Sequence, residues 1–170
     1  MMEGQDASYA VSVGVDGGIC ALSYEELNSA QIIKSVGDDA AGAVAVFIGT
    51  TRNSFGGKVV TRLEYQAYSK LAIKTMVKIV QDARDLISRS DHQPPSQNIS
   101  SLIRCAVHHR LGTVPVGEPS IVIAVSSPHR KEAFVACEYI LEEVKKKAQI
   151  WKREYYEGET DANAQWKSNA

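Results

Sequence analysis

The segment Ile121-Val-Ile-Ala-Val-Ser-Ser-Pro-His-Arg130 decides the class of fold, because it joins an apolar strand directly to the start of a long helix. The run from Ile121 to Val125 predicts a buried strand. Ser127 and Pro128 are residue types favoured at the N-cap and the first position of a helix, and apolar residues recur at helical spacing to about Ala148. The expected core face of this helix is Ala133, Phe134, Cys137, Ile140, Leu141 and Val144.

Two more strands and a second long helix are expected upstream. Ala41 to Ile48 is almost continuously apolar, which predicts a central strand, and Val59 to Tyr68 alternates in polarity, which predicts its hairpin partner. Ser69 is a suitable cap for a helix that ends near Ser88. The expected core face of that helix is Leu71, Met76, Val80, Ala83 and Ile87.

The remaining elements are shorter. A capping-box pattern at Ser23–Glu26 predicts a helix from Tyr24 to Ser35, and Ser90–Ser100, with two adjacent prolines, predicts a loop. Short strands are expected at Tyr9–Val15, Leu102–His109 and Trp151–Tyr156. This order predicts an α+β fold, with a mostly antiparallel sheet and two long helices. We expect residues 1–10 to be a flexible tail, 11–156 one domain and 157–170 a polar tail.

The composition is typical of a globular domain, with 44% hydrophobic and 23% charged residues among 170. No apolar run is long enough to span a membrane and the N-terminus has no leader pattern, so we expect a cytosolic protein. A net charge of −1 argues against binding to nucleic acid. The strongest electropositive feature is local and consists of Lys145, Lys146, Lys147, Lys152 and Arg153.

The three cysteines form neither a CxxC pair nor a metal-ligand spacing, which argues against disulfides and zinc. Cys105 and Cys137 lie in apolar surroundings and are expected to be buried and inert. His108 and His109 have no carboxylate or cysteine partner nearby in the sequence. We therefore expect neither a metal nor a cofactor.

Three polar segments are candidates for chemistry. The helix start at Ser127–Arg130 favours an anion, and His129 and Arg130 add a donor and a permanent charge; a capped helix with two solvated side chains explains the segment more simply. Lys145 and Lys152 are seven residues apart and would share a face if the helix continued that far, where one amine could become a base or a nucleophile; the alternative is a solvated helix end. Gly49–Asn53, with Arg52, either lines a cleft or forms a simple turn.

Four motifs taken together closely resemble the large, catalytic subunit of molybdopterin synthase. They are Val46-Phe-Ile-Gly-Thr-Thr-Arg-Asn53, His109-Arg-Leu-Gly112, Ser127-Pro-His-Arg130 and Ala148-Gln-Ile-Trp-Lys-Arg-Glu154. Their order and spacing agree with that family from about Ala41 to Glu154. One departure is Thr50, which stands where the family often has a lysine.

The resemblance implies an α/β-hammerhead fold and a heterotetramer, in which a dimer of large subunits binds two small ubiquitin-like subunits. Each small subunit would end in a Gly-Gly thiocarboxylate and pass sulfur to cyclic pyranopterin monophosphate. Two such transfers form the dithiolene of molybdopterin, a step of molybdenum cofactor biosynthesis that needs no metal. The resemblance implies that Lys145 and Lys152 are catalytic and bind the substrate, and that further contacts come from Arg52, His129, Arg130, Arg153 and Glu154.

A straight helix would hold Arg130 and Lys145 roughly 22 Å apart, too far for one small substrate to touch both. We therefore expect a twofold dimer in which His129 and Arg130 of one chain complete the site around Lys145 and Lys152 of the other. Two rival functions remain: a non-catalytic scaffold for an acidic or ubiquitin-like partner, and an RNA-binding domain. The second is disfavoured by the low aromatic content of 7%.

Overall fold

The computed structural model describes residues 7–88 and 101–169, which form two sheets, three α-helices and one short 3₁₀ helix. The predicted loop Ser90–Ser100 lies outside the described residues. The larger sheet has the order β1 (Val11–Val15), β2 (Gly18–Ser23), β6 (Arg104–Arg110), β8 (Pro119–Ser127) and β3 (Ala43–Thr50). Its pairs are antiparallel apart from β2 with β6, so the predicted α+β class is confirmed.

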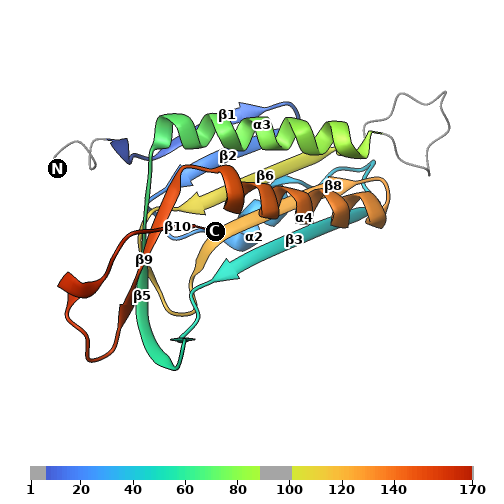
Figure 1. Cartoon of the computed structure of the whole chain (residues 1–170). Coiled ribbons are helices and arrows are strands. Elements are labelled where there is room, and N and C mark those ends of the chain that lie inside the picture. The colour runs from blue at the N-terminus through green and yellow to red at the C-terminus, as the bar shows by residue number, and fades with distance from the viewer. Residues whose placement is uncertain (1–6, 89–100, 170) are drawn as a thin grey trace.

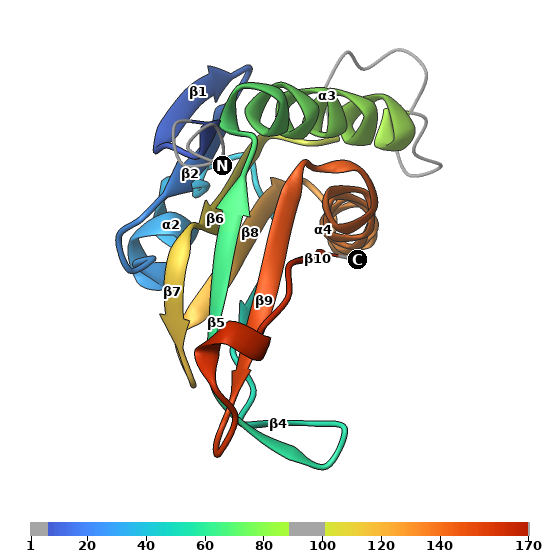
Figure 2. The same ribbon diagram turned by 60° about the vertical axis from the view of Figure 1, so that its left-hand side comes forward.

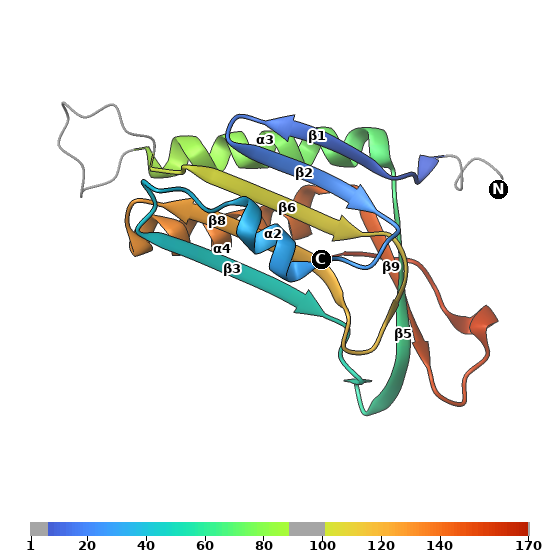
Figure 3. The same cartoon turned by 180° about the vertical axis from the view of Figure 1, so that it is seen from behind.

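Helices cover both faces of the larger sheet. The long helices α3 (Ser69–Ile87) and α4 (Arg130–Lys147) pack side by side on one face, and the short α2 (Ser29–Ser35) covers part of the other (Figures 1 and 3). The central strands β6 and β8 are therefore apolar toward both faces, as strands covered on both sides must be. The apolar segment Ile121–Val125 is buried throughout, as predicted.

The second sheet stands at one end of the first, and Figure 2 shows β5 and β9 running from the helices to that far end. Its order is β10 (Lys167–Ser168), β9 (Ile150–Tyr156), β5 (Lys58–Ala67) and β4 (Ser54–Phe55), with β7 (Gly112–Pro115) also paired to β5. Gly56 and Gly57, both at positive φ, make the tight turn between β4 and β5. After β9 in the sequence, the chain forms a 3₁₀ helix, η1 (Asp161–Asn163), and then β10.

The predicted hairpin of Ala41–Ile48 with Val59–Tyr68 is wrong. β3 pairs with β8, whereas β5 pairs with β4, β7 and β9. Nor is β3 central, because it forms one edge of the larger sheet and only alternate residues point toward α4. Local sequence cannot distinguish an apolar central strand from an apolar edge strand, because that distinction depends on which strands pair with it.

All three described α-helices start differently from expectation, and α3 begins at Ser69 with Tyr68, not Ser69, as its N-cap. Asn28, not Ser23, caps α2 by accepting a hydrogen bond from Gln31 N, and Ser23 belongs to β2, a strand that the sequence analysis did not predict. Ser127 and Pro128 precede α4, which begins at Arg130 with His129 as its N-cap. Two residues assigned to the core are exposed, namely Leu71 and Phe134.

Candidate functional site

A cavity of about 320 Å³ lies where the ends of β3, β6 and β8 meet the second sheet. It receives side chains from both sheets, from the last turn of α4 and from the C-terminal segment. Its polar and charged lining includes residues far apart in the chain: Thr50, Arg52, Ser54, Tyr65, His109, Ser120, Lys145, Lys152, Glu154 and Asn169.

Lys145 and Lys152 line this cavity together, although no continuous helix connects them. α4 ends at Lys147, and Ala148 has extended backbone angles, φ −70° and ψ 137°. The chain then turns into β9, which carries Lys152 back past the end of the helix. A chain reversal therefore brings the two lysines to one cavity, and the shared helical face considered from the sequence does not form.

Glu154 is the acidic group of the cavity, and its side chain is only 7% exposed. Its carboxylate lies 3.8 Å from Lys152 Nζ and 3.7 Å from Lys167 Nζ, and it accepts a hydrogen bond from the Tyr156 hydroxyl. That hydrogen bond is the main cause that raises the pKa of Tyr156 to about 12. Glu154 therefore places negative charge beside Lys152 inside the cavity.

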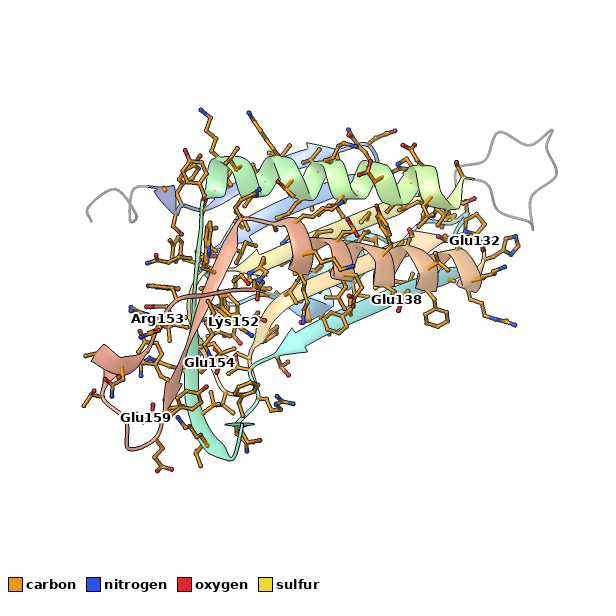
Figure 4. All side chains as sticks on the ribbon, viewed as in Figure 1. Glu132, Glu138, Lys152, Arg153, Glu154 and Glu159 are labelled. Carbon is orange, nitrogen blue, oxygen red and sulfur yellow. The ribbon has the colours of Figure 1, made fainter. Side chains whose placement is uncertain are left out.

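Arg153 does not line the cavity, because successive residues of a strand point to opposite faces. Figure 4 shows the alternation of Lys152, Arg153 and Glu154 along β9. Arg153 Nε donates to Glu64 Oε1 at 2.6 Å, and the guanidinium lies 4.5 Å from the Trp166 ring centroid. In the single chain, Arg153 holds the C-terminal segment against the outer face of β9.

His129 and Arg130 lie in a different pocket, of about 550 Å³, which they line with Gly42, Pro128 and Lys131. This pocket is at the N-terminal end of α4, whereas Lys145 is in the last helical turn. The structure thus brings together Arg52, Lys145, Lys152 and Glu154, and leaves His129 and Arg130 at the other end of the helix.

Several polar residues of the cavity were missed as site candidates, and His109 and Asn169 are two of them. His109 is 1% exposed, and Asn169 belongs to the segment expected to be a polar tail. The signal for His109 was its place in the motif His109–Gly112. No local pattern marks Asn169, whose position depends on the pairing of β10 with β9.

The cysteines stand apart from this site. Cys20, Cys105 and Cys137 are all buried, and burial raises the thiol pKa of each, to about 12 in Cys20 and to about 11 in Cys137. None of them lines the cavity, and the predicted burial of Cys105 and Cys137 is confirmed. Within residues 7–88 and 101–169, no three His, Cys, Asp or Glu side chains are arranged to hold a metal ion. No helix in these ranges is long and apolar enough to cross a membrane.

Comparison with known proteins gives a consistent family. Residues 22–147 match the family described as "MoaE protein". The chain is 41% identical to molybdopterin synthase catalytic subunit 2 of Aedes aegypti over 87% of each chain. It is 43% identical to the catalytic subunit of Taeniopygia guttata over 87% of this chain and 85% of that one.

Solved structures agree in fold. Molybdopterin synthase from Staphylococcus aureus superposes with a TM-score of 0.66 at 29% identity, over 86% of this chain and 94% of that one. The complex of subunits 1 and 2 of molybdopterin-converting factor from Helicobacter pylori gives 0.63 at 22% identity, over 82% and 86%. Because the family match covers most of the chain and the relatives are about 40% identical, this chain belongs to the MoaE family, that of the molybdopterin synthase catalytic subunits.

Proposed function

We propose that the chain is the catalytic subunit of a molybdopterin synthase and transfers two sulfurs to cyclic pyranopterin monophosphate. The sulfur donor is the thiocarboxylated Gly-Gly end of a small ubiquitin-like carrier subunit. The observation that supports this most directly is the cavity in which Lys145, Lys152 and Arg52 gather around a space sized for a small molecule.

Both reactants are anions, so they repel each other as they approach. Two amines and a guanidinium that line the cavity lower that repulsion and stabilise the negative charge that develops during transfer. Sulfur of the thiocarboxylate bonds to a substrate carbon while a C–O bond of that carbon breaks and the oxygen leaves with a proton, so the carrier stays attached as a thioester. Water then cleaves the thioester, so the carrier leaves with a carboxylate and the substrate keeps the sulfur. Lys145 and Lys152 are placed to move protons in these steps.

The carrier supplies the sulfur, since the three cysteines of this chain are buried away from the cavity. A solved structure of the same fold is a complex of two different subunits, which supports a small partner for this chain as well. Glycines at the end of the carrier allow its backbone to pass through a narrow opening. The reaction needs no membrane, and a cytosolic location remains a prediction.

We also propose that two copies of this chain share each site, because Arg130 and Lys145 lie at opposite ends of α4. β3 offers the surface for this pairing. It is an edge strand without charged residues or proline, the features that usually block edge-to-edge pairing. Its outer apolar face is open, with Val44 at 45%, Val46 at 38% and Ile48 at 40% exposure.

Antiparallel pairing of two β3 edges about a twofold axis would bring the distant groups together. The start of β3 lies beside the start of α4, since Gly42 N donates to Ser127 O, and Thr50 at its other end lines the Lys145 cavity. The twofold axis therefore places the His129–Arg130 pocket of one copy next to the Lys145–Lys152 cavity of the other. Each dimer then carries two equivalent composite sites.

The test is sulfur transfer with a thiocarboxylated carrier in vitro. We expect conversion of the pterin substrate to its dithiolene, and loss of transfer when one bulky residue is added after the final glycine of the carrier. The rival function, a scaffold for a ubiquitin-like partner, predicts binding of the carrier without turnover. Turnover with the carrier that has the added bulky residue would exclude a model in which the carrier's glycine end passes through a narrow opening.

A further inference from the structure

His109 presents an uncharged hydrogen-bond acceptor to a cavity that otherwise carries two lysines. Its Nδ1 lies 2.8 Å from the Arg110 backbone oxygen, and because a carbonyl only accepts, Nδ1 must carry the hydrogen. Nε2 is then the acceptor, and Asn169 Nδ2 donates to it at 3.2 Å. The two contacts together fix both the tautomer and the direction of the Nε2 lone pair.

The surroundings keep the ring neutral and in place. His109 is 1% exposed and packs edge-on against the Tyr65 ring, with centroids 4.9 Å apart. Burial, with a smaller contribution from the charge of Lys145, lowers its pKa to about 4. The titratable and charged groups that share the cavity are Tyr65, Lys145, Lys152, Glu154 and Arg52. An imidazole held this way offers only an acceptor at neutral pH, so its natural partner is an N–H group.

The last described residues of this chain already supply such a partner. β10 pairs with Trp151 and Lys152 of β9, and Asn169 then extends its side-chain amide into the cavity. The contact comes from an extended segment that is held to β9 by only two residue pairs. A peptide N–H from the extended tail of another chain would meet the same acceptor with the same chemistry.

We propose that His109 Nε2 accepts a hydrogen bond from the N–H of the terminal glycine of the sulfur carrier, and that Asn169 holds this position until the carrier arrives. This inference rests on the proposed function. In a terminal glycine the amide nitrogen and the reactive carbonyl carbon are only roughly 2.5 Å apart. Fixing that nitrogen at His109 therefore directs the thiocarboxylate toward Lys145, which lines the same cavity.

The sharpest test removes one hydrogen from the carrier and leaves this chain intact. Carrier is prepared by protein ligation with either glycine or sarcosine as its last residue, so that the second form lacks the terminal N–H. We expect wild-type protein to bind the glycine form about tenfold more tightly, the worth of one buried hydrogen bond. Equal affinity for the two carriers would overturn the inference.

Variants distinguish the hydrogen bond from the bulk of the added methyl group. His109→Leu, which has no acceptor, should bind both carriers alike, whereas His109→Gln, which keeps an acceptor, should retain part of the preference. Asn169→Ala should bind the glycine carrier more tightly than wild type, because no side chain has to be displaced. A preference that persists in His109→Leu would assign the effect to steric exclusion and contradict the proposal.

A kinetic measurement separates this inference from the proposed function. With thiocarboxylated carrier, His109→Leu should raise KM for the carrier and leave KM for the pterin substrate unchanged. If wild type transfers sulfur but does not distinguish the glycine carrier from the sarcosine carrier, only the role of His109 is refuted and the proposed function stands. Absence of both carrier binding and transfer would refute the proposed function.

Discussion

Arg130 and Lys145 lie at the two ends of α4, fifteen residues apart, and about 60° from each other around the helix. Phe134, Glu138 and Leu141 fall between them on the same stripe. Glu138 is on the side of α4 that faces away from α3, toward the β3 edge (Figure 4). The exposed Phe134 and the unpaired edge of β3 therefore lie on the same side of the molecule, with Arg130 and Lys145 at the two ends of the helix stripe.

Complementation tests whether two chains share a site. Arg130→Ala and Lys145→Ala proteins should each be inactive, but mixing them should restore up to about half of the wild-type activity per heterodimer, because both lesions fall in the same one of the two sites. Sulfur transfer is measured after subunit exchange has been verified by mass spectrometry. Failure to regain activity despite exchange would show that each site is built within one chain.

A single lysine, and not bulk positive charge, should control turnover. Lys145→Ala is expected to lower kcat at least about 100-fold through loss of a placed proton donor and charge. Lys146→Ala removes the same charge one residue away, where the side chain does not line the cavity, and should change kcat less than about threefold. Thermal unfolding of both variants checks that the fold is unchanged. Similar losses in the two would favour a bulk electrostatic effect.

A charge on the β3 edge should separate the copies. Val46→Lys places an ammonium on the open apolar face of β3 and is expected to convert a dimer into a monomer, as measured by analytical ultracentrifugation. Val13→Lys is the matched control, since Val13 is 36% exposed on β1, at the opposite edge of the same sheet. Dimers that survive Val46→Lys but dissociate in the control would place the interface at the other edge.

The protein should become less stable as the pH drops, because the buried His109 ring resists protonation in the folded state. The folded state holds its pKa near 4, below the ordinary 6.5, so the unfolded chain takes up a proton first as the pH drops. The stabilisation from the neutral ring is fully present above about pH 6.5 and is lost progressively toward pH 4, by up to about 3 kcal/mol.

Urea unfolding at pH 7 and pH 4.5 measures this dependence. Acidic groups also contribute to it, so the comparison is between wild type and His109→Gln, which cannot titrate at this position. The loss of stability between the two pH values should be smaller in the variant. Parallel losses would mean that protonation of His109 is not coupled to folding.

The sequence by itself determined the elements whose residues interact locally. The long helices, the buried strand Ile121–Val125 and the glycine turn at Gly56–Gly57 follow from apolar spacing and backbone preference, both of which act within a few residues. The resemblance that these motifs carry also pointed to Arg52, Lys145, Lys152 and Glu154, which the structure gathers around one cavity.

Only the tertiary structure decided how these elements combine. β3 became an edge strand, because β8 is its one strand partner among the described residues, and its apolar residues could not reveal this. Lys145 and Lys152 met through a chain reversal after Lys147, Arg153 turned away by strand alternation, and Asn169 reached His109 through β10. Pairing between distant segments decides the edge position of β3 and the contact of Asn169 with His109, and residue spacing along the chain does not predict such pairing.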